Sequence, residues 1–193
     1  MTTETTLKAM RTVDGREVPA AGTWDFDPTH LSVTFEARHM MIAKVRGSFT
    51  AAEGTITVGD DPAGSSVEVS INTSSIESGS DERDAHLRSG DFLDVEKYPT
   101  MTYIGASLEL VGDRYRLDGE LTIKDVTRPV SLDLKFNGAI VDPWGNTRAA
   151  FSASSEIDRT EWDLTWNVPL ETGGMLVGKT IKIVVEAEAV LRS

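Results

Sequence analysis

The sequence predicts an all-β fold, a closed antiparallel barrel of about eight strands with a short helical insertion. Three observations predict it. From Gly22 onward, apolar and polar residues alternate with a period of two, as they do in strands with one face inside and one in water. Turn-forming residues separate the alternating runs. One stretch near the middle breaks the alternation and carries the residues of a helix start.

The run over residues 31–39 shows the alternation most clearly, because Glu36 and Arg38 mark its solvent face. Successive side chains of a strand point to opposite faces, so the odd-numbered residues of this run face the interior. Residues 67–71, 115–123 and 181–189 follow the same pattern. Several inward positions are small, and small inward residues leave room inside a barrel. The small ones are Ala37, Gly47, Gly105, Gly119, Ala153, Ala187 and Ala189.

Turn chemistry separates the runs. Residues 59–64 are rich in Gly, Asp and Pro, Gly112-Asp113 joins two further runs, and residues 142–146 place Pro at a favoured turn position before Gly and Asn. Residues 78–88 begin with serines that can cap a helix, continue with acids and end with bases, which is the charge order that a helix dipole favours. We therefore expect a helix between two strands there.

The composition suits one domain. The 193 residues match the size of a single barrel. We expect a flexible arm over residues 1–21 and the barrel over 22–193. Residues 1–21 contain no apolar stretch of the kind that a secretion signal has, which predicts a cytoplasmic location. No run approaches the ~18 apolar residues of a membrane span, so we expect no membrane insertion.

The formal net charge of −12 argues against nucleic-acid binding, which requires a basic face. The same charge disfavours unaided adsorption to anionic lipid. The absence of cysteine excludes disulfides, thiolate metal sites and thiol nucleophiles.

A series of motifs runs in order through the chain. Their residues are Asp27-Pro28-Thr29-His30, Arg38-His39-Met40, Val45-Arg46-Gly47-Ser48-Phe49, residues 82–92, Tyr98-Pro99, Gly119-Glu120-Leu121-Thr122-Ile123, Val126-Thr127-Arg128-Pro129-Val130, Asp142-Pro143-Trp144-Gly145 and residues 158–162. In this order they resemble the YceI-like family of polyisoprenoid-binding proteins, over about residues 22–190. Two positions depart from the family pattern: Leu31 stands where Ser is frequent, and Asp163 where Gly is usual.

The resemblance implies a lipocalin-like barrel with an elongated hydrophobic pocket. It also implies a long-chain polyisoprenoid or isoprenoid quinone as ligand, bound for carriage, storage or protection, with no cofactor required. A homodimer is compatible with the resemblance, although no interface patch can be recognised in the sequence.

Alternation and resemblance together predict the ligand-binding residues. They are Phe35, His39, Met41, Phe49, Val69, Ile71, Tyr103, Leu121, Ile123, Phe136, Phe151, Ile183 and Val185. Lys44 and Arg46 are candidates to neutralise a diphosphate or quinone headgroup. Residues 40–42 form either a mouth, because methionine adapts to lipid-like ligands, or a turn folded onto the core. We expect the helical insertion to plug one end of the barrel and this mouth to lie at the other.

Other functions fit the sequence less well than binding. His30, His39 and His86 lack the paired spacing of a metal site, so we predict no metal. Asp27, His30 and Ser32 could be read as a catalytic group, but no oxyanion donor accompanies them. We therefore predict a binding protein rather than an enzyme. A stress-response or scaffold protein with a solid barrel and an enzyme acting on a lipid-like substrate stay open as alternatives.

Overall fold

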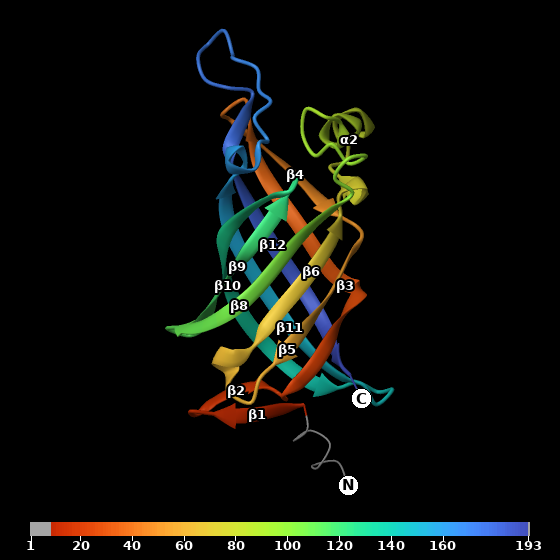
Figure 1. The fold of residues 1–193 in the computed structure, drawn as a ribbon, viewed down its shortest axis with the longest axis vertical. Coiled ribbons are helices and arrows are strands. Elements are labelled where there is room, and N and C mark those ends of the chain that lie inside the picture. The colour runs from red at the N-terminus through yellow and green to blue at the C-terminus, as the bar shows by residue number, and fades with distance from the viewer. Residues whose placement is uncertain (1–8, 193) are drawn as a thin grey trace.

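Eight strands close into an antiparallel ring (Figure 1). The structure, a computed structural model, describes residues 9–192. Around the ring the order is β3, β5, β6, β8, β9, β10, β11 and β12, and β12 pairs with β3 to close it. The elements are β1 (Met10–Val13), β2 (Arg16–Pro19), β3 (Gly22–His39), β4 (Ala43–Phe49), β5 (Ala52–Val58), η1 (Pro62–Gly64), β6 (Ser66–Asn72), η2 (Thr73–Ser75), β7 (Ile76–Glu77), α2 (Asp81–Arg88), β8 (Thr100–Val111), β9 (Arg114–Ile123), β10 (Val126–Val141), β11 (Thr147–Asp158), η3 (Arg159–Trp162) and β12 (Val177–Leu191).

The predicted fold class is confirmed, and β3 explains how the ring closes. Along one edge β3 pairs with β12 over nearly its whole length. Along the other edge its first residues pair with β5 and its last residues with β4. The predicted inward faces meet in this register, since Phe35 lies opposite Ile183 and Val33 opposite Val185. Apolar cross-strand neighbours on one face stabilise a sheet in one register.

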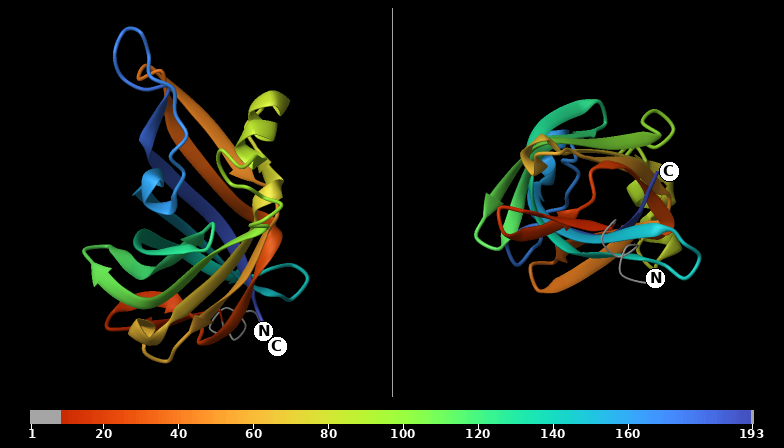
Figure 2. Two further views of the ribbon diagram at one scale, coloured as in Figure 1. Left: turned by 45° about the horizontal axis from the view of Figure 1, so that its top comes forward. Right: turned by 90° about the horizontal axis from the view of Figure 1, so that it is seen from below.

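The expectation of a loose N-terminal arm is wrong for its described part. β1 and β2 form a hairpin that lies across the lower end of the barrel (Figure 2, right). Ala9 and Val18 are buried, and the Arg11 guanidinium donates to the backbone carbonyl of Asp60 at 2.6 Å. Asp14-Gly15 has positive φ at both residues, which is the two-residue turn that Asp-Gly favours between strands. The Asp14-Gly15 dipeptide is the feature of the sequence that could have predicted this hairpin. Residues 1–8 of the expected arm lie outside the described residues.

The predicted helix is confirmed as α2, where the Ser80 hydroxyl caps the first turn by accepting from the backbone of Arg83 at 3.4 Å. Its place differs from the expectation. α2 and the turn at residues 40–42 lie at the same, upper end of the barrel (Figure 1), and the β1–β2 hairpin closes the opposite end. Sequence order could not show this, because the end of the barrel at which a connection lies depends on how many strands separate it from the other connection. No helix among residues 9–192 is long and apolar enough to cross a bilayer.

Candidate functional site: an apolar cavity inside the barrel

A cavity of about 310 Å³ occupies the inside of the barrel. Ligand pockets in proteins span about 300–1,000 Å³ and are mostly apolar. Every strand of the ring contributes side chains to its wall, and these are almost all aliphatic or aromatic. Ala37, Ala153 and Ala187 belong to the wall, so these small inward residues do leave space, as the sequence predicts.

The inward glycines act differently. A Cβ on Gly119 would lie 2.6 Å from the Tyr103 hydroxyl, and a Cβ on Gly105 would lie 2.9 Å from Leu117. Phe35 fills the corresponding space at Gly47. The expectation that these glycines enlarge the interior is therefore wrong, because larger cross-strand neighbours lie over them.

Elements outside the ring of strands cover both ends of the cavity. At the lower end, Val18 and Pro19 of the N-terminal hairpin reach the wall. At the upper end, Leu87 of α2 and Phe92 and Leu93 just after it do so. These five residues were absent from the predicted lining, since strand alternation says nothing about residues outside strands.

An aromatic cluster holds the upper cover to the barrel. The His86 ring lies 4.5 Å from the Trp166 ring and 5.0 Å from the Phe92 ring, edge to face in both pairs. Trp162 is buried beneath and donates its indole N–H to the Leu121 carbonyl at 3.0 Å. Edge-to-face aromatic pairs add to the energy of apolar burial. The residues after η3 are thereby fixed against α2.

Two of the polar side chains at the cavity wall, Tyr103 and Arg159, donate to backbone carbonyls. The Tyr103 hydroxyl lies 3.0 Å from the Leu117 carbonyl oxygen and 3.1 Å from that of Val130. Burial raises the pKa of Tyr103 above its ordinary value, which keeps the phenol neutral. Arg159 is buried and donates to the carbonyls of Gly178, Val177 and Leu164. Burial lowers its pKa, although the nearby Asp158 carboxylate opposes this. The wall therefore offers apolar contact and few free polar groups.

Comparison with known proteins assigns the family. The profile of the YceI-like domain matches residues 24–189. The chain belongs to the YceI-like family. Protein YceI of Salmonella newport is 36% identical over 161 residues, which is 83% of this chain and 84% of that protein.

Two solved structures support the fold of this YceI-like chain. Burkholderia cenocepacia BcnA superposes with a TM-score of 0.72 at 18% identity, covering 85% of this chain and 99% of the other. A polyisoprenoid-binding domain from Saccharophagus degradans superposes with a TM-score of 0.67 at 13% identity, covering 88% and 98%. At these identities the likeness shows the shared fold alone. The sequence resemblance to the family and the barrel that it implies are thus confirmed.

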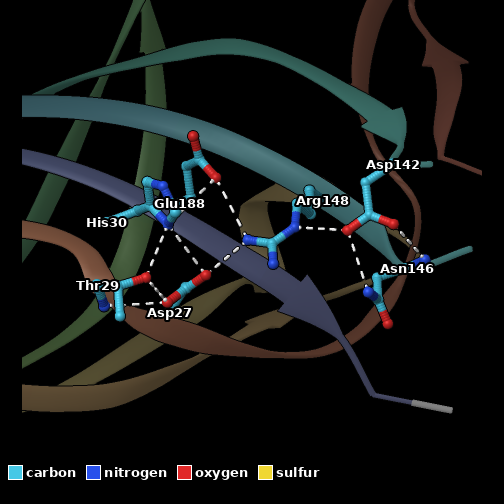
Figure 3. A network of polar contacts seen from close by, with 7 residues as sticks. All are labelled: Asp27, Thr29, His30, Asp142, Asn146, Arg148 and Glu188. Carbon is cyan, nitrogen blue, oxygen red and sulfur yellow. Dashed lines mark hydrogen bonds and ion pairs between the residues drawn. The ribbon is translucent and has the colours of Figure 1, made fainter. Parts of the chain in front are cut away.

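Residues of the family motifs at 27–30 and 142–145 meet Arg148 and Glu188 in a polar network (Figure 3). Arg148 of β11 lies at its centre, 2.7 Å from an Asp27 carboxylate oxygen and 2.8 Å from one of Asp142. His30 Nδ1 lies 3.1 Å from Asp27. The network therefore connects β3 to β11 and to the β10–β11 turn across 121 residues of sequence.

Hydrogen bonds in this network lower the pKa of both aspartates. For Asp27 the donors are first Thr29 and then Arg148. For Asp142, burial opposes ionisation, but the donors Arg148, Asn146 and Trp144 outweigh it and bring the pKa to about 2. Ser32, the third member of the group considered as catalytic, is exposed and belongs to none of these contacts. The network is built to hold strands together.

Eleven of the thirteen predicted ligand-binding residues line the cavity. They are Phe35, Phe49, Val69, Ile71, Tyr103, Leu121, Ile123, Phe136, Phe151, Ile183 and Val185. His39 and Met41 do not, because β3 extends beyond the closed part of the barrel before it turns. His39 lies opposite Ala43 and Val177 at that extension, and Met41 is 56% exposed.

The two headgroup candidates lie outside the cavity. Lys44 Nζ is 2.7 Å and Arg46 Nε 2.9 Å from the Glu36 carboxylate. The register explains this: Arg46 lies opposite Glu36 and Lys44 opposite Arg38, so both bases share the solvent face of β3. The pKa of Glu36 is lowered by Lys44 first and by Arg46 after it.

Proposed function

We propose that this YceI-like barrel binds the apolar chain of a polyisoprenoid or an isoprenoid quinone in its cavity, for carriage, storage or protection. The observation that carries the proposal is the cavity itself, which is enclosed by strands all round and lined almost wholly by apolar side chains. The name of the Saccharophagus degradans domain, a polyisoprenoid-binding domain of the same fold, supports the same class of ligand.

The energetics favour a long unbranched or regularly branched tail. Transfer of a CH₂-sized group from water to an apolar wall contributes about 0.8 kcal/mol, so one isoprene unit of five carbons contributes roughly 4 kcal/mol before losses. Immobilising a flexible chain offsets much of this. Because the wall is almost wholly apolar, the tail supplies most of the affinity. No cofactor is needed for such binding.

The alternatives fit the interior less well. A solid scaffold barrel would have its inward side chains in mutual contact throughout, whereas a cavity of about 310 Å³ lies here. A lipid-modifying enzyme would need two or more reactive groups aimed into the cavity. Tyr103 and Arg159 face it, but their donors are committed to backbone carbonyls.

The test is to extract the purified protein with organic solvent and identify the extracted lipids by mass spectrometry. We expect a prenol, a prenyl phosphate or a prenyl quinone in near-stoichiometric amount. Added long-tailed prenyl quinone should also quench the fluorescence of Trp162 and Trp166, which lie near the upper end of the cavity. Absence of any co-purified lipid, together with absence of quenching, would exclude the proposal.

A further inference from the structure

Five large apolar side chains are exposed together at the upper end of the barrel. We define them as the apolar tip: Met40, Met41, Ile42, Val168 and Met175. Their exposed fractions run from 42% for Val168 to 84% for Ile42. They come from two segments far apart in sequence, the β3–β4 turn and the loop before β12. These segments lie side by side in two views (Figures 1 and 2), and the Met40 N–H donates to the Leu176 carbonyl at 2.7 Å.

The backbone of the turn does not account for its methionines. Met40 has φ of 51° and Met41 of 64°, in the left-handed region that is unfavourable for residues with a Cβ. Gly or Asn at these positions would form the same turn with less strain. Backbone strain of this kind is concentrated at functional sites. The exposed methionine side chains therefore need a reason other than folding.

The charge around the apolar tip is opposite to that of the whole chain. Residues 36–46 and 165–179 contain four basic side chains and two acidic ones, in a protein of net charge −12. The bases are Arg38, Lys44, Arg46 and Lys179, and the acids are Glu36 and Glu171. Exposed apolar residues flanked by bases are typical of surfaces that enter the headgroup region of an anionic bilayer.

The apolar tip adjoins one end of the cavity. Ala37 precedes the β3–β4 turn, Val177 follows the second segment, and both line the cavity. A second exposed apolar pair consists of Ile140, near the end of β10, and Trp144, in the β10–β11 turn. That turn lies at the lower end of the barrel (Figure 1). There it adjoins the acidic network of Asp27, Asp142 and Glu188, of which Arg148 neutralises only part. The apolar tip is thus flanked by bases and the Ile140–Trp144 pair by acids, so of these two patches the tip is the one that suits an anionic surface.

We propose that the apolar tip docks this protein on the surface of a bilayer that contains anionic lipid, with the upper end of the cavity facing the lipid. The tip side chains enter the headgroup boundary, and Arg38, Lys44, Arg46 and Lys179 contact lipid phosphates. The acidic residues of α2, on the other side of the same end, limit the depth of entry. Docking goes beyond the proposed ligand binding, and it can be measured without ligand, so the two proposals can fail separately.

The experiment is vesicle co-sedimentation of the full chain. Vesicles of phosphatidylcholine alone are compared with vesicles that also contain a minority of phosphatidylglycerol. We expect binding to the anionic vesicles that weakens with added salt. The double substitution Met41→Ser with Ile42→Ser should weaken it roughly tenfold or more, since two side chains lose their apolar burial. Trp144→Ser is the matched control, because Trp144 is 83% exposed at the opposite end, and it should bind as the parent does.

Circular dichroism and thermal melting first establish that both variants are folded. Failure of the parent chain to bind anionic vesicles would overturn the proposal, and so would equal loss in the Trp144→Ser control. Analytical ultracentrifugation addresses a second copy of the chain as occupant of the tip. A parent dimer that the Met41→Ser with Ile42→Ser variant converts to a monomer, without any vesicle binding by either, would assign the tip to self-association instead.

Discussion

Ala153→Leu tests whether the cavity is the ligand site. Ala153 lines the middle of the wall, opposite Leu134 on β10 and Val185 on β12. Leucine adds three carbons to the interior. A long bound tail therefore loses a similar volume of the cavity and the apolar contacts made there. At about 0.8 kcal/mol per carbon the loss of binding free energy is roughly 2.4 kcal/mol, or about 50-fold in affinity. Without ligand, the filled space leaves the melting temperature unchanged or raises it.

Affinity is measured by quenching of tryptophan fluorescence with a long-tailed prenyl quinone and with a short-tailed analogue. We expect the long-tailed quinone to lose more affinity than the short-tailed one, because the short tail fills only part of the cavity. Ala106→Leu is the matched control, since Ala106 is exposed on β8, and it should bind both ligands as the parent does. Unchanged binding of the long tail by a folded Ala153→Leu variant would refute the assignment of the cavity as the site.

Three further predictions concern the frame around the cavity. Gly119→Ala places a Cβ 2.6 Å from the Tyr103 hydroxyl and should lower the free energy of unfolding by about 1–3 kcal/mol; an unchanged urea midpoint would contradict it. The pKa of Asp142 is lowered to about 2, so its carboxylate stabilises the fold above pH ~4 and this contribution is lost as the pH falls toward 2. Arg148→Gln removes the main hydrogen-bond donor to Asp142, so the pKa of Asp142 should rise. The midpoint of acid unfolding, measured by circular dichroism, should therefore move to higher pH. Arg159→Met removes the donors that hold the residues after η3, so limited proteolysis should cut residues 163–176 faster, while an unchanged cleavage rate would show that Arg159 does not hold them.

The walls of the barrel were predictable from particular residues. Glu36 and Arg38 mark the outer face of β3, and the alternation of the strand places their neighbours Phe35 and Ala37 inside. The helix start at Ser80 was equally local, because the cap and the acids that follow it lie within one turn. One departure from the family pattern is also explained: Asp163 has φ of 58°, a conformation that Gly adopts without strain and Asp tolerates.

Headgroup candidates were less predictable, for reasons of register and strand length. Lys44 and Arg46 were assigned by proximity to the turn, but pairing opposite Arg38 and Glu36 turns them to solvent. Met41, predicted to line the pocket, lies in the turn after β3, which ends at His39, and its side chain is exposed. The room attributed to Gly119 is occupied by Tyr103, a residue of the neighbouring strand.

The amino-acid sequence by itself determined the strands, their inward faces, the capped helix and the family, because each depends on residues a few positions apart or on motif order. Only the tertiary structure decided the rest. The joining of Asp27 to Arg148, the meeting of the two segments of the apolar tip and the covering of both cavity ends all involve distant residues. The distances between these residues depend on the number of strands in the ring and on the stagger between neighbouring strands. Both are properties of the closed barrel as a whole.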